Sequence, residues 1–284
     1  MEFSPIEPRI IGVEIQNLDL ARPLDREKVA AINDALDRYL VLVMRGQKLS
    51  DPDLLAFSRN LGELDPPGPN PYGEPFLKQF PDINVISNVV EHGRPIGNLG
   101  AGEAAWHADM TYIEVPPKAA VLYALEIPAD GAGDTYFASM FAAYDALPAE
   151  LKAEIRGKTA VHDASRNSAG MLRRGYAEVA DVRETRGAHH PLARTDARTG
   201  RKALFLGRRH NSYIPGMPVG ESEKLLDRLW AHATQPQFTM RHRWRAGDVL
   251  IWSNLAVLHR RDPFDATSRR IMHRTQIKGV EHIA

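Results

Sequence analysis

The sequence predicts an antiparallel β-barrel or β-sandwich with helices packed against it. Segments with strand character dominate the middle and the end of the 284-residue chain. Helical periodicity is confined to the N-terminal region and to stretches between strands. The chain has no repeated strand–helix unit, no glycine-rich dinucleotide motif and no P-loop, which argues against a parallel α/β sheet.

The N-terminal region shows a helix, a strand and a second helix. Residues 23–40 place apolar side chains at three- and four-residue steps, which is typical of an amphipathic helix. The apolar run at 41–44 predicts a short buried strand. Ser50 and Asp53 form a capping-box pattern, so we expect a second helix to begin there. The stretch 66–81 is rich in proline and glycine and predicts a loop.

The rest of the chain alternates strand patterns with short helices. Residues 164–189 are polar and lack periodicity, so we predict a mobile excursion that acts as a lid. No long linker divides the chain, which predicts one domain over residues 1–284. We expect strands at 83–90, 106–112, 119–126, 134–137, 238–244, 249–252 and 270–277, helices at 140–147, 148–155 and 221–233, and a hairpin at 192–206.

Composition restricts the possible functions. The absence of cysteine excludes disulfides, thiolate metal sites and cysteine nucleophiles. The 36 basic residues balance 36 acidic ones, so we expect no nucleic-acid partner. No apolar run approaches the roughly 20 residues of a membrane helix, and no secretory signal pattern is visible. We therefore expect a cytoplasmic protein that is not embedded in a membrane.

One short motif points to a metal. His107 and Asp109 form a His-x-Asp triplet, and residues two apart in a strand project from the same face. With one more histidine they would form the two-histidine, one-carboxylate triad that binds iron(II) and leaves coordination positions open. His259 is the candidate, because it ends an apolar segment, whereas His189, His190 and His273 lack this setting. On its own the triplet also fits a strand histidine hydrogen-bonded to a neighbouring acid.

Two arginines suggest an anionic ligand. Arg270 and Arg274 share a face if residues 270–277 form a strand. Two guanidinium groups directed into a barrel mouth would require anionic partners such as carboxylates. Thr135 could hydrogen-bond the same carboxylate. The alternatives are solvent-facing arginines that pair with surface acids, and an ordinary strand threonine.

These motifs together resemble the taurine dioxygenase and 2,4-dichlorophenoxyacetate dioxygenase family, TauD/TfdA. The matching stretches follow the family order and span nearly the whole chain. They are 41–47, 57–63, 106–112, 133–135, 252–261 and 269–274.

The resemblance implies a double-stranded β-helix, that is, a cupin-like jelly roll, with flanking helices. It implies that His107, Asp109 and His259 bind Fe(II), and that Thr135 and Arg270 hold the cosubstrate 2-oxoglutarate. Arg274 would face the anionic group of a small organic substrate, which is a carboxylate such as an aryloxyalkanoate, or a sulfonate or sulfate ester. The implied reaction uses O2 to hydroxylate the substrate next to a heteroatom and releases succinate and CO2. Relatives are commonly dimers or tetramers, so a homo-oligomer is expected.

Departures from the family pattern bear on the substrate. Taurine enzymes carry histidines where this chain has residues 65–68, and an expected asparagine is replaced by Glu103. Taurine or another alkylsulfonate is therefore the alternative substrate. Residues 207–217 are similar to aryloxyalkanoate-degrading members, which suggests that His210 and Tyr213 contact the substrate along with Glu103.

Two other function classes stay open on the sequence. A metal-dependent hydrolase could use the same ligands, but it would leave Arg270 and Thr135 without a role. A non-catalytic jelly-roll binding protein would leave the open triad without one. Only the dioxygenase predicts that turnover depends on O2 and 2-oxoglutarate.

Overall fold

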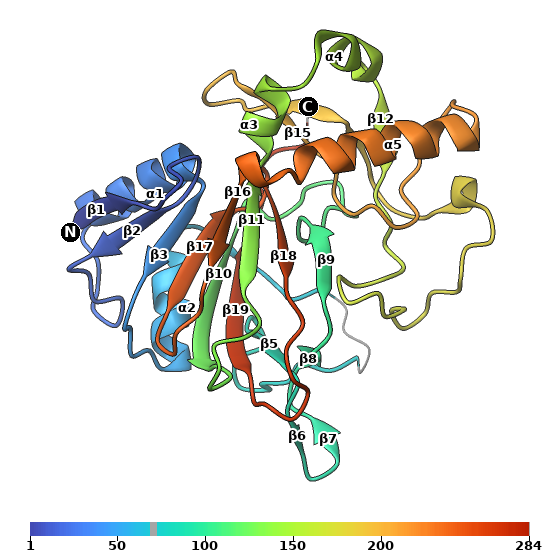
Figure 1. The fold of residues 1–284 in the computed structure, drawn as a ribbon. Helices are drawn as coiled ribbons and strands as arrows, with labels where there is room; N and C mark the ends of the chain where they lie inside the picture. Colours follow the sequence, from blue (N-terminus) through green and yellow to red (C-terminus); the bar gives the residue numbers. More distant parts are fainter. Residues whose placement is uncertain (69–72, 284) are drawn as a thin grey trace.

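Two β-sheets face each other at the centre of the molecule. The computed structural model describes residues 1–68 and 73–283 (Figure 1). The larger sheet has nine strands within this described part, and the smaller has four. This pair of predominantly antiparallel sheets, with helices outside them, is the predicted jelly roll.

The larger sheet is built around β10 (Ala119–Glu126), which pairs antiparallel with β17 (Val249–Ser253) and β19 (Ile271–Ile277). Val121 lies opposite Ile251 on one side and Thr275 on the other. The strand order is β1-β2-β3-β17-β10-β19-β5-β8, with β4 paired to β19. The other strands are β1 (Glu2–Pro5), β2 (Val13–Gln16), β3 (Val41–Met44), β4 (Leu64–Asp65), β5 (Asn84–Ser87) and β8 (Asn98–Leu99).

The smaller sheet has the order β16-β11-β18-β9. In β18, His259 lies opposite Phe137 of β11 on one side and His107 of β9 on the other. The register therefore brings together two histidines that are far apart in the sequence. The strands are β9 (Ala104–His107), β11 (Thr135–Ser139), β16 (Thr239–His242) and β18 (Val257–Arg261).

The two faces of the larger sheet bury different sets of side chains. Leu250 and Trp252 of β17 belong to the core that also holds Phe137 of the smaller sheet. Val249 and Ile251 belong to a second core with the helices. This alternation is the two-residue period of a strand that is buried on both faces. Helices α1 (Arg26–Tyr39) and α2 (Asp51–Arg59) contribute to that second core.

Local sequence sets the ends of these two helices. The Asp25 side chain caps α1 by accepting from the backbone N–H of Lys28. Leu40 ends α1 in a left-handed conformation, with φ 65°. Ser50 and Asp53 form the predicted capping box of α2.

The remaining elements lie mainly at one end of the sheets (Figure 1). Helices α3, α4 and α5 cover that end, and their buried side chains join the core between the sheets. The bounds are α3 (Met140–Asp145), α4 (Ala149–Ile155), α5 (Val219–Ala233), β12 (Thr159–Val161) paired with β13 (His189–Pro191), β14 (Ala193–Thr195) paired with β15 (Lys202–Leu204), β6 (Val90–Glu91) paired with β7 (Arg94–Pro95), and the 3-10 turns η1 (Val182–Glu184) and η2 (Pro236–Phe238).

Several predicted boundaries were wrong. The strand expected at 83–90 is β5 followed by the separate β6–β7 hairpin, and the strand expected at 106–112 ends at His107. The N-terminal strands β1 and β2 were not predicted, because they are short and β1 is exposed throughout. Residues 164–189 contain little regular structure beyond η1, as expected.

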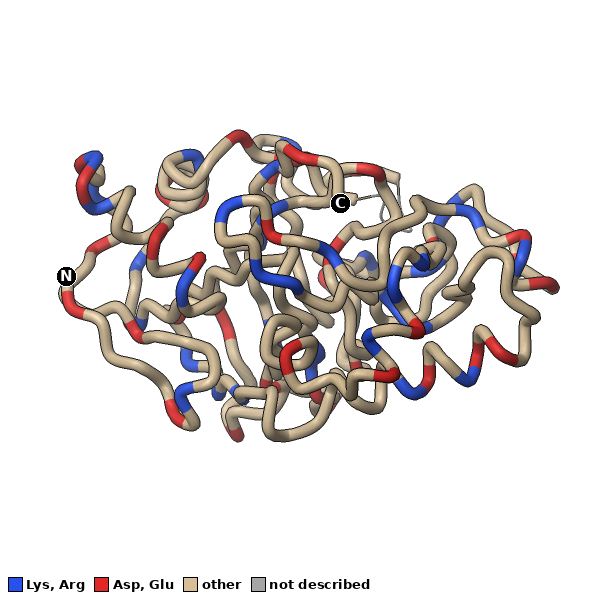
Figure 2. The backbone as a smooth tube through the Cα atoms, turned by 90° about the horizontal axis from the view of Figure 1, so that it is seen from above, with Lys and Arg blue, Asp and Glu red and all other residues tan. Residues whose placement is uncertain are grey.

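Charges of both signs are interspersed along the backbone (Figure 2). Within the described residues, no helix is long and apolar enough to cross a bilayer.

A buried ion pair gives the first prediction, on stability. Asp248 is fully buried before β17 and accepts from Arg45 Nη1 at 2.5 Å, His242 Nε2 at 3.1 Å and the Arg245 backbone at 2.9 Å. We expect Asp248→Ala to lower the free energy of unfolding by about 3 kcal/mol, because it leaves these donors without an acceptor. Urea unfolding measures this. Asp19→Ala is the control, because it removes an exposed ion pair with Arg22 and should leave the free energy of unfolding nearly unchanged. Equal losses in the two variants would contradict the stabilising role of the buried Asp248.

Candidate active site

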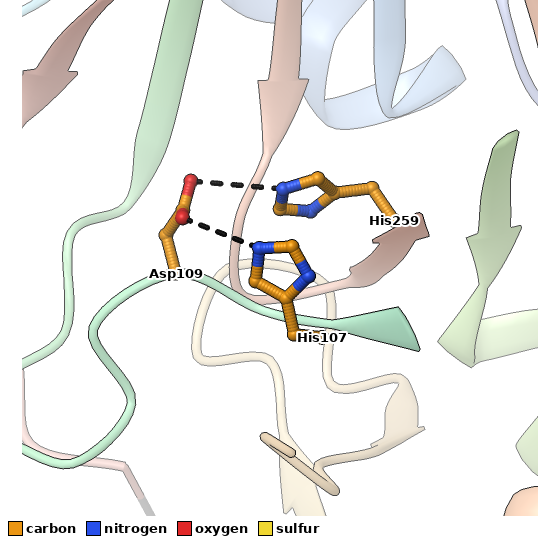
Figure 3. A group of neighbouring side chains, drawn as sticks. All are labelled: His107, Asp109 and His259. Atoms are coloured by element: carbon orange, nitrogen blue, oxygen red, sulfur yellow. Dashed lines mark ion pairs between the residues drawn. The ribbon is translucent and has the colours of Figure 1, made fainter. Parts of the chain in front are cut away.

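Three buried side chains converge at one end of the smaller sheet. They are His107 at the end of β9, His259 in β18, and Asp109 just beyond β9 (Figure 3). His107 Nε2 lies 3.7 Å from Asp109 Oδ1, and His259 Nε2 lies 3.8 Å from Asp109 Oδ2. One donor atom from each residue falls within 4.8 Å of the other two. The structure thus brings together the three residues that the sequence predicted as metal ligands.

The reason given for pairing His107 with Asp109 was wrong. Asp109 does not continue the strand, because β9 ends at His107 and Met110 adopts a positive φ of 50°. The backbone N–H of Ala108 instead donates to the carbonyl of Gly207 at 2.9 Å. Asp109 therefore reaches the histidines from a turn rather than by alternation along a strand.

Asn254 holds that turn in place. Its Oδ1 accepts from the Asp109 backbone N–H at 2.7 Å. Its Nδ2 donates to the carbonyls of Asp109 at 2.8 Å and Pro117 at 2.9 Å. Asn254 is 1% exposed, so these bonds form away from bulk water. The side chain fixes the backbone on both sides of the Asp109 Cα and was not singled out by the sequence.

Asn254 gives the second prediction. We expect Asn254→Ala to lower the affinity for Fe(II) or Mn(II) by about 10- to 100-fold. The substitution removes the hydrogen bonds that position Asp109, and a metal site binds its ion more weakly when a ligand loses such bonds. Calorimetric titration of the metal-free protein measures this. Asn60→Ala is the matched control, because it removes an exposed side-chain hydrogen bond from Asn60 Nδ2 to the Ala56 carbonyl at the end of α2. Equal metal affinity in the two variants would contradict the positioning role.

The histidines are oriented for metal binding. His107 Nδ1 lies 2.7 Å from the Ala105 carbonyl, which can only accept, so Nδ1 is the donor. In the neutral ring this leaves the lone pair on Nε2, the atom that faces Asp109. Burial lowers the pKa of His107 and holds that of His259 well below its usual range. Both rings are therefore neutral near pH 7, the form that ligates metals.

Asp109 is ionised and lies beside a guanidinium group. Burial alone would raise its pKa, but the charge of Arg274 and the neighbouring imidazole of His107 hold it far below its usual range. Arg274 Nη1 donates to Asp109 Oδ1 at 2.9 Å and Oδ2 at 3.1 Å. The two His–Asp separations are too long for direct hydrogen bonds. Two imidazoles and one carboxylate directed at a shared point fit a divalent iron.

Arg270 is buried without an anionic partner. It immediately precedes β19 and is 2% exposed, beneath the rings of Phe264 at 5.8 Å and Trp244 at 6.0 Å. Among residues 1–68 and 73–283, no carboxylate forms an ion pair with it. Burial and the neighbouring charge of Arg261 lower the pKa of Arg270 to about 9. A negatively charged group beside it would compensate this buried charge.

Thr135 lies in the same region. Its Oγ1 accepts from Trp244 Nε1 at 2.9 Å, and Trp244 is one of the two rings that contact Arg270. This bond leaves the hydroxyl hydrogen free to donate. Thr135 is directly opposite Arg261 in the smaller sheet.

A cavity lies next to Asp109. Arginines from three separate segments face it: Arg173 from the 164–189 excursion, Arg208 after β15, and Arg274 from β19. Sequence reasoning identified only Arg274. The complete lining is Gly68, Asn84, Asn98, Leu99, Asp109, Met110, Tyr112, Asn167, Ser168, Arg173, Arg208 and Arg274.

Three other predicted substrate contacts lie elsewhere. Glu103 is exposed and lies 3.8 Å from Arg260 Nη1. Tyr213 is buried, and its hydroxyl donates to the Met217 carbonyl at 2.6 Å. His210 is exposed and borders a separate hollow beside Trp106. None of the three lines the cavity at Asp109.

The rival histidines have other partners. His273 Nδ1 lies 2.6 Å from Asp51 of α2, on the helix-covered face of the larger sheet. His190 Nε2 contacts the carbonyls of Thr111 and Ile113 at 2.9 and 3.0 Å. His189 is exposed in β13. This leaves His259 as the third ligand candidate.

Comparison with known proteins identifies the family. Residues 2–276 match the family model described as taurine catabolism dioxygenase TauD, TfdA family. The chain belongs to the TauD/TfdA family. It is 36% identical over 279 residues to the alpha-ketoglutarate-dependent 2,4-dichlorophenoxyacetate dioxygenase of Cupriavidus pinatubonensis, covering 95% of each chain.

Other TauD/TfdA relatives agree with this result. The alpha-ketoglutarate-dependent sulfate ester dioxygenase of Pseudomonas putida is 33% identical, with 98% of this chain and 90% of the relative covered. The crystal structure of AAD-2 in complex with Mn(II) and N-oxalylglycine superimposes with a TM-score of 0.81 and 29% identity, covering 100% of this chain and 99% of the other. The jelly-roll prediction is thereby confirmed.

This TauD/TfdA protein is an Fe(II)- and 2-oxoglutarate-dependent dioxygenase, as the relatives and the His-Asp-His cluster together indicate. Its cosubstrates are 2-oxoglutarate and O2. The hydrolase and the non-catalytic binding protein are set aside, since neither accounts for the family match.

Proposed function

We propose that this enzyme hydroxylates a small carboxylate of the aryloxyalkanoate type at the carbon next to the ether oxygen. The reaction would couple this step to conversion of 2-oxoglutarate and O2 into succinate and CO2. The observation that supports the substrate class is Arg274, whose guanidinium faces the cavity directly beside Asp109. A relative with 36% identity is named for 2,4-dichlorophenoxyacetate.

His107, Asp109 and His259 would hold the iron, which supplies the oxidising chemistry when bound. The protein contributes rigid placement of these ligands. His107 is fixed through Nδ1 by Ala105, and Asp109 through its backbone by Asn254. The site is buried, so water is kept from the reacting atoms.

Arg270 and Thr135 would bind the distal carboxylate of 2-oxoglutarate. Arg270 offers a buried planar fork that matches a carboxylate, and Thr135 offers a free hydroxyl hydrogen. Trp244 contacts both residues and would keep them aligned. The distal carboxylate would be the anionic partner that Arg270 lacks among the described residues.

Arg274 would exchange partners when substrate binds. Its hydrogen bonds to both Asp109 oxygens compete with use of that carboxylate as a metal ligand. A substrate carboxylate would accept the Arg274 donors and position the adjacent C–H bond next to the metal site. Arg274 thus links substrate binding to the arrangement of Asp109.

The walls of the pocket would come from two irregular segments. The 164–189 excursion supplies Asn167, Ser168 and Arg173, and we propose that it closes over the substrate as part of a single 1–284 domain. The loop predicted at 66–81 supplies Gly68, while residues 69–72 lie outside the described residues.

The expectations of a homo-dimer or tetramer, a cytoplasmic location and no nucleic-acid partner stay predictions.

A substrate panel tests the proposal. Succinate formation would be followed with phenoxyacetate, an alkyl sulfate ester and taurine, each with and without Fe(II). We expect phenoxyacetate to give the largest metal-dependent rate. The sulfate ester is the second candidate, because a relative named for that substrate class is 33% identical. Turnover of taurine alone would contradict the proposed substrate class.

A further inference from the structure

Cations outnumber anions around the cavity beside Asp109. Three guanidinium groups line it, from Arg173, Arg208 and Arg274, while Asp109 is the one acidic side chain in the described lining. Asp109 is already bonded to Arg274 at 2.9 and 3.1 Å. Arg173 and Arg208 therefore face this space without a carboxylate partner among the described lining residues.

Arg208 is held in place in the cavity wall. Its backbone forms an isolated β-bridge with His107, and its Nη1 donates to the Arg166 carbonyl at 2.7 Å. Its Nε is buried and has no hydrogen-bond partner. Burial and the charge of Arg173 lower its pKa to about 10, so it is still a cation at neutral pH.

Arg173 is fixed beside it. It is 7% exposed, its Nη1 donates to the Ala164 carbonyl at 2.9 Å, and its guanidinium lies 4.0 Å from the centre of the Tyr112 ring. Its Nε is also buried without a partner. Carbonyl and ring contacts orient the group but do not neutralise it.

The acids that the structure describes near this pair do not balance its charge. The charges of Asp109 and Asp163 both reach Arg208, but Asp109 is bonded to Arg274. The Asp163 carboxylate is hydrogen-bonded to Ser165 and Asn211 and forms no ion pair with either arginine. Two buried like charges repel each other unless an anion lies between them. A carboxylate or sulfate would satisfy the open donors of both.

We propose that Arg173 and Arg208 form a second anion subsite, so that the preferred substrate carries two anionic groups. One group would bind Arg274 and the other would bind the Arg173–Arg208 pair. This inference rests on the proposed function and narrows its substrate class from monocarboxylates to dianions, such as aryloxyacetates with a second carboxylate on the ring. An apolar substrate without a second anionic group would leave Arg173 and Arg208 without an anionic partner.

The test compares phenoxyacetate with its 2-, 3- and 4-carboxy derivatives. Binding is measured by calorimetry on protein loaded with Mn(II) and N-oxalylglycine, which does not turn over. We expect at least one dianion to bind about ten-fold or more tightly than phenoxyacetate, the effect of a hydrogen bond to a charged group. If no isomer exceeds phenoxyacetate, the second subsite is contradicted.

Variants identify the residues responsible. Arg173→Gln and Arg208→Gln should each reduce the ratio of dianion to phenoxyacetate affinity towards one, while Arg173→Lys should restore part of it. Arg174→Gln changes an exposed neighbour outside the lining and should keep the wild-type ratio. An unchanged ratio in both glutamine variants would overturn the proposal.

A separate readout distinguishes this proposal from the proposed function. Anaerobic addition of 2-oxoglutarate to the Fe(II) protein reports on the cosubstrate site alone. If Arg173→Gln weakens 2-oxoglutarate binding as strongly as dianion binding, the arginine serves the cosubstrate and the subsite is contradicted. If wild-type protein binds no 2-oxoglutarate, the proposed function itself fails.

Discussion

Replacing Asp109 with alanine is expected to lower substrate-dependent succinate formation on the order of 10³-fold or more. The variant loses one of the three proposed iron ligands. Stabilisation by a metal ion lowers an activation barrier by several kcal/mol, and a 10³-fold loss of rate corresponds to about 4 kcal/mol. It also leaves Arg274 without its partner at 2.9 Å, so substrate placement suffers as well. The measurement is succinate release with saturating Fe(II), 2-oxoglutarate and substrate.

Controls separate loss of metal from loss of fold. Metal affinity should fall with activity in Asp109→Ala. The metal-free variant should still unfold in one cooperative thermal transition, with a midpoint lowered by the loss of the Arg274 ion pair. Glu63→Ala removes an exposed carboxylate paired with Lys278 and should retain full activity. Undiminished succinate production in Asp109→Ala would contradict the ligand assignment.

Replacing Arg270 with glutamine is expected to raise the KM for 2-oxoglutarate by about 10²-fold or more. Truncating one partner of a buried charge pair costs about 2–5 kcal/mol, and Arg270 is 2% exposed. Arg270→Lys should recover little, because an ammonium cannot reproduce the two parallel bonds of a guanidinium. Arg269→Gln is the matched control, since this neighbour is half exposed and pairs with Glu126 at 2.9 Å.

Replacing Arg270 with methionine should not lower stability when 2-oxoglutarate is absent. Without 2-oxoglutarate, Arg270 is a buried cation with no ion-pair partner among the described residues, and its removal relieves that cost. We expect Arg270→Met to equal or exceed the wild type in free energy of unfolding when cosubstrate is absent. Adding 2-oxoglutarate should stabilise only the wild type. A large loss of stability in the cosubstrate-free variant would show that Arg270 has a structural role instead.

Strand periodicity and helix caps predicted much of the framework. The apolar run at 41–44 and the capping box of α2 were both visible in local sequence. Strands β1 and β2 were missed. β1 is an exposed edge strand without buried periodicity, and β2 has only four residues. The pairing of β2 depends on β3, which is distant in sequence.

The site was predicted unevenly for a physical reason. His107 and His259 face each other through the β9–β18 register, which no local pattern specifies. The His-x-Asp triplet and the apolar segment ending at His259 made them candidates, and the family resemblance turned the candidates into an assignment. Arg173 and Arg208 gave no signal, because irregular segments bring them to the cavity through backbone contacts. Glu103 was placed by sequence position alone, and its side chain is exposed.

One anaerobic titration tests the central claim most directly. Fe(II) is added to the protein without oxygen, followed by 2-oxoglutarate, and the visible absorption spectrum is recorded. The assignment of His107, Asp109 and His259 as iron ligands, with Arg270 on the cosubstrate, predicts a charge-transfer band from the chelated 2-oxo acid. The band should be lost in Asp109→Ala and should require far more 2-oxoglutarate in Arg270→Gln. A wild-type protein that gives no band, or an Asp109→Ala variant with an unchanged band, would contradict the assignment.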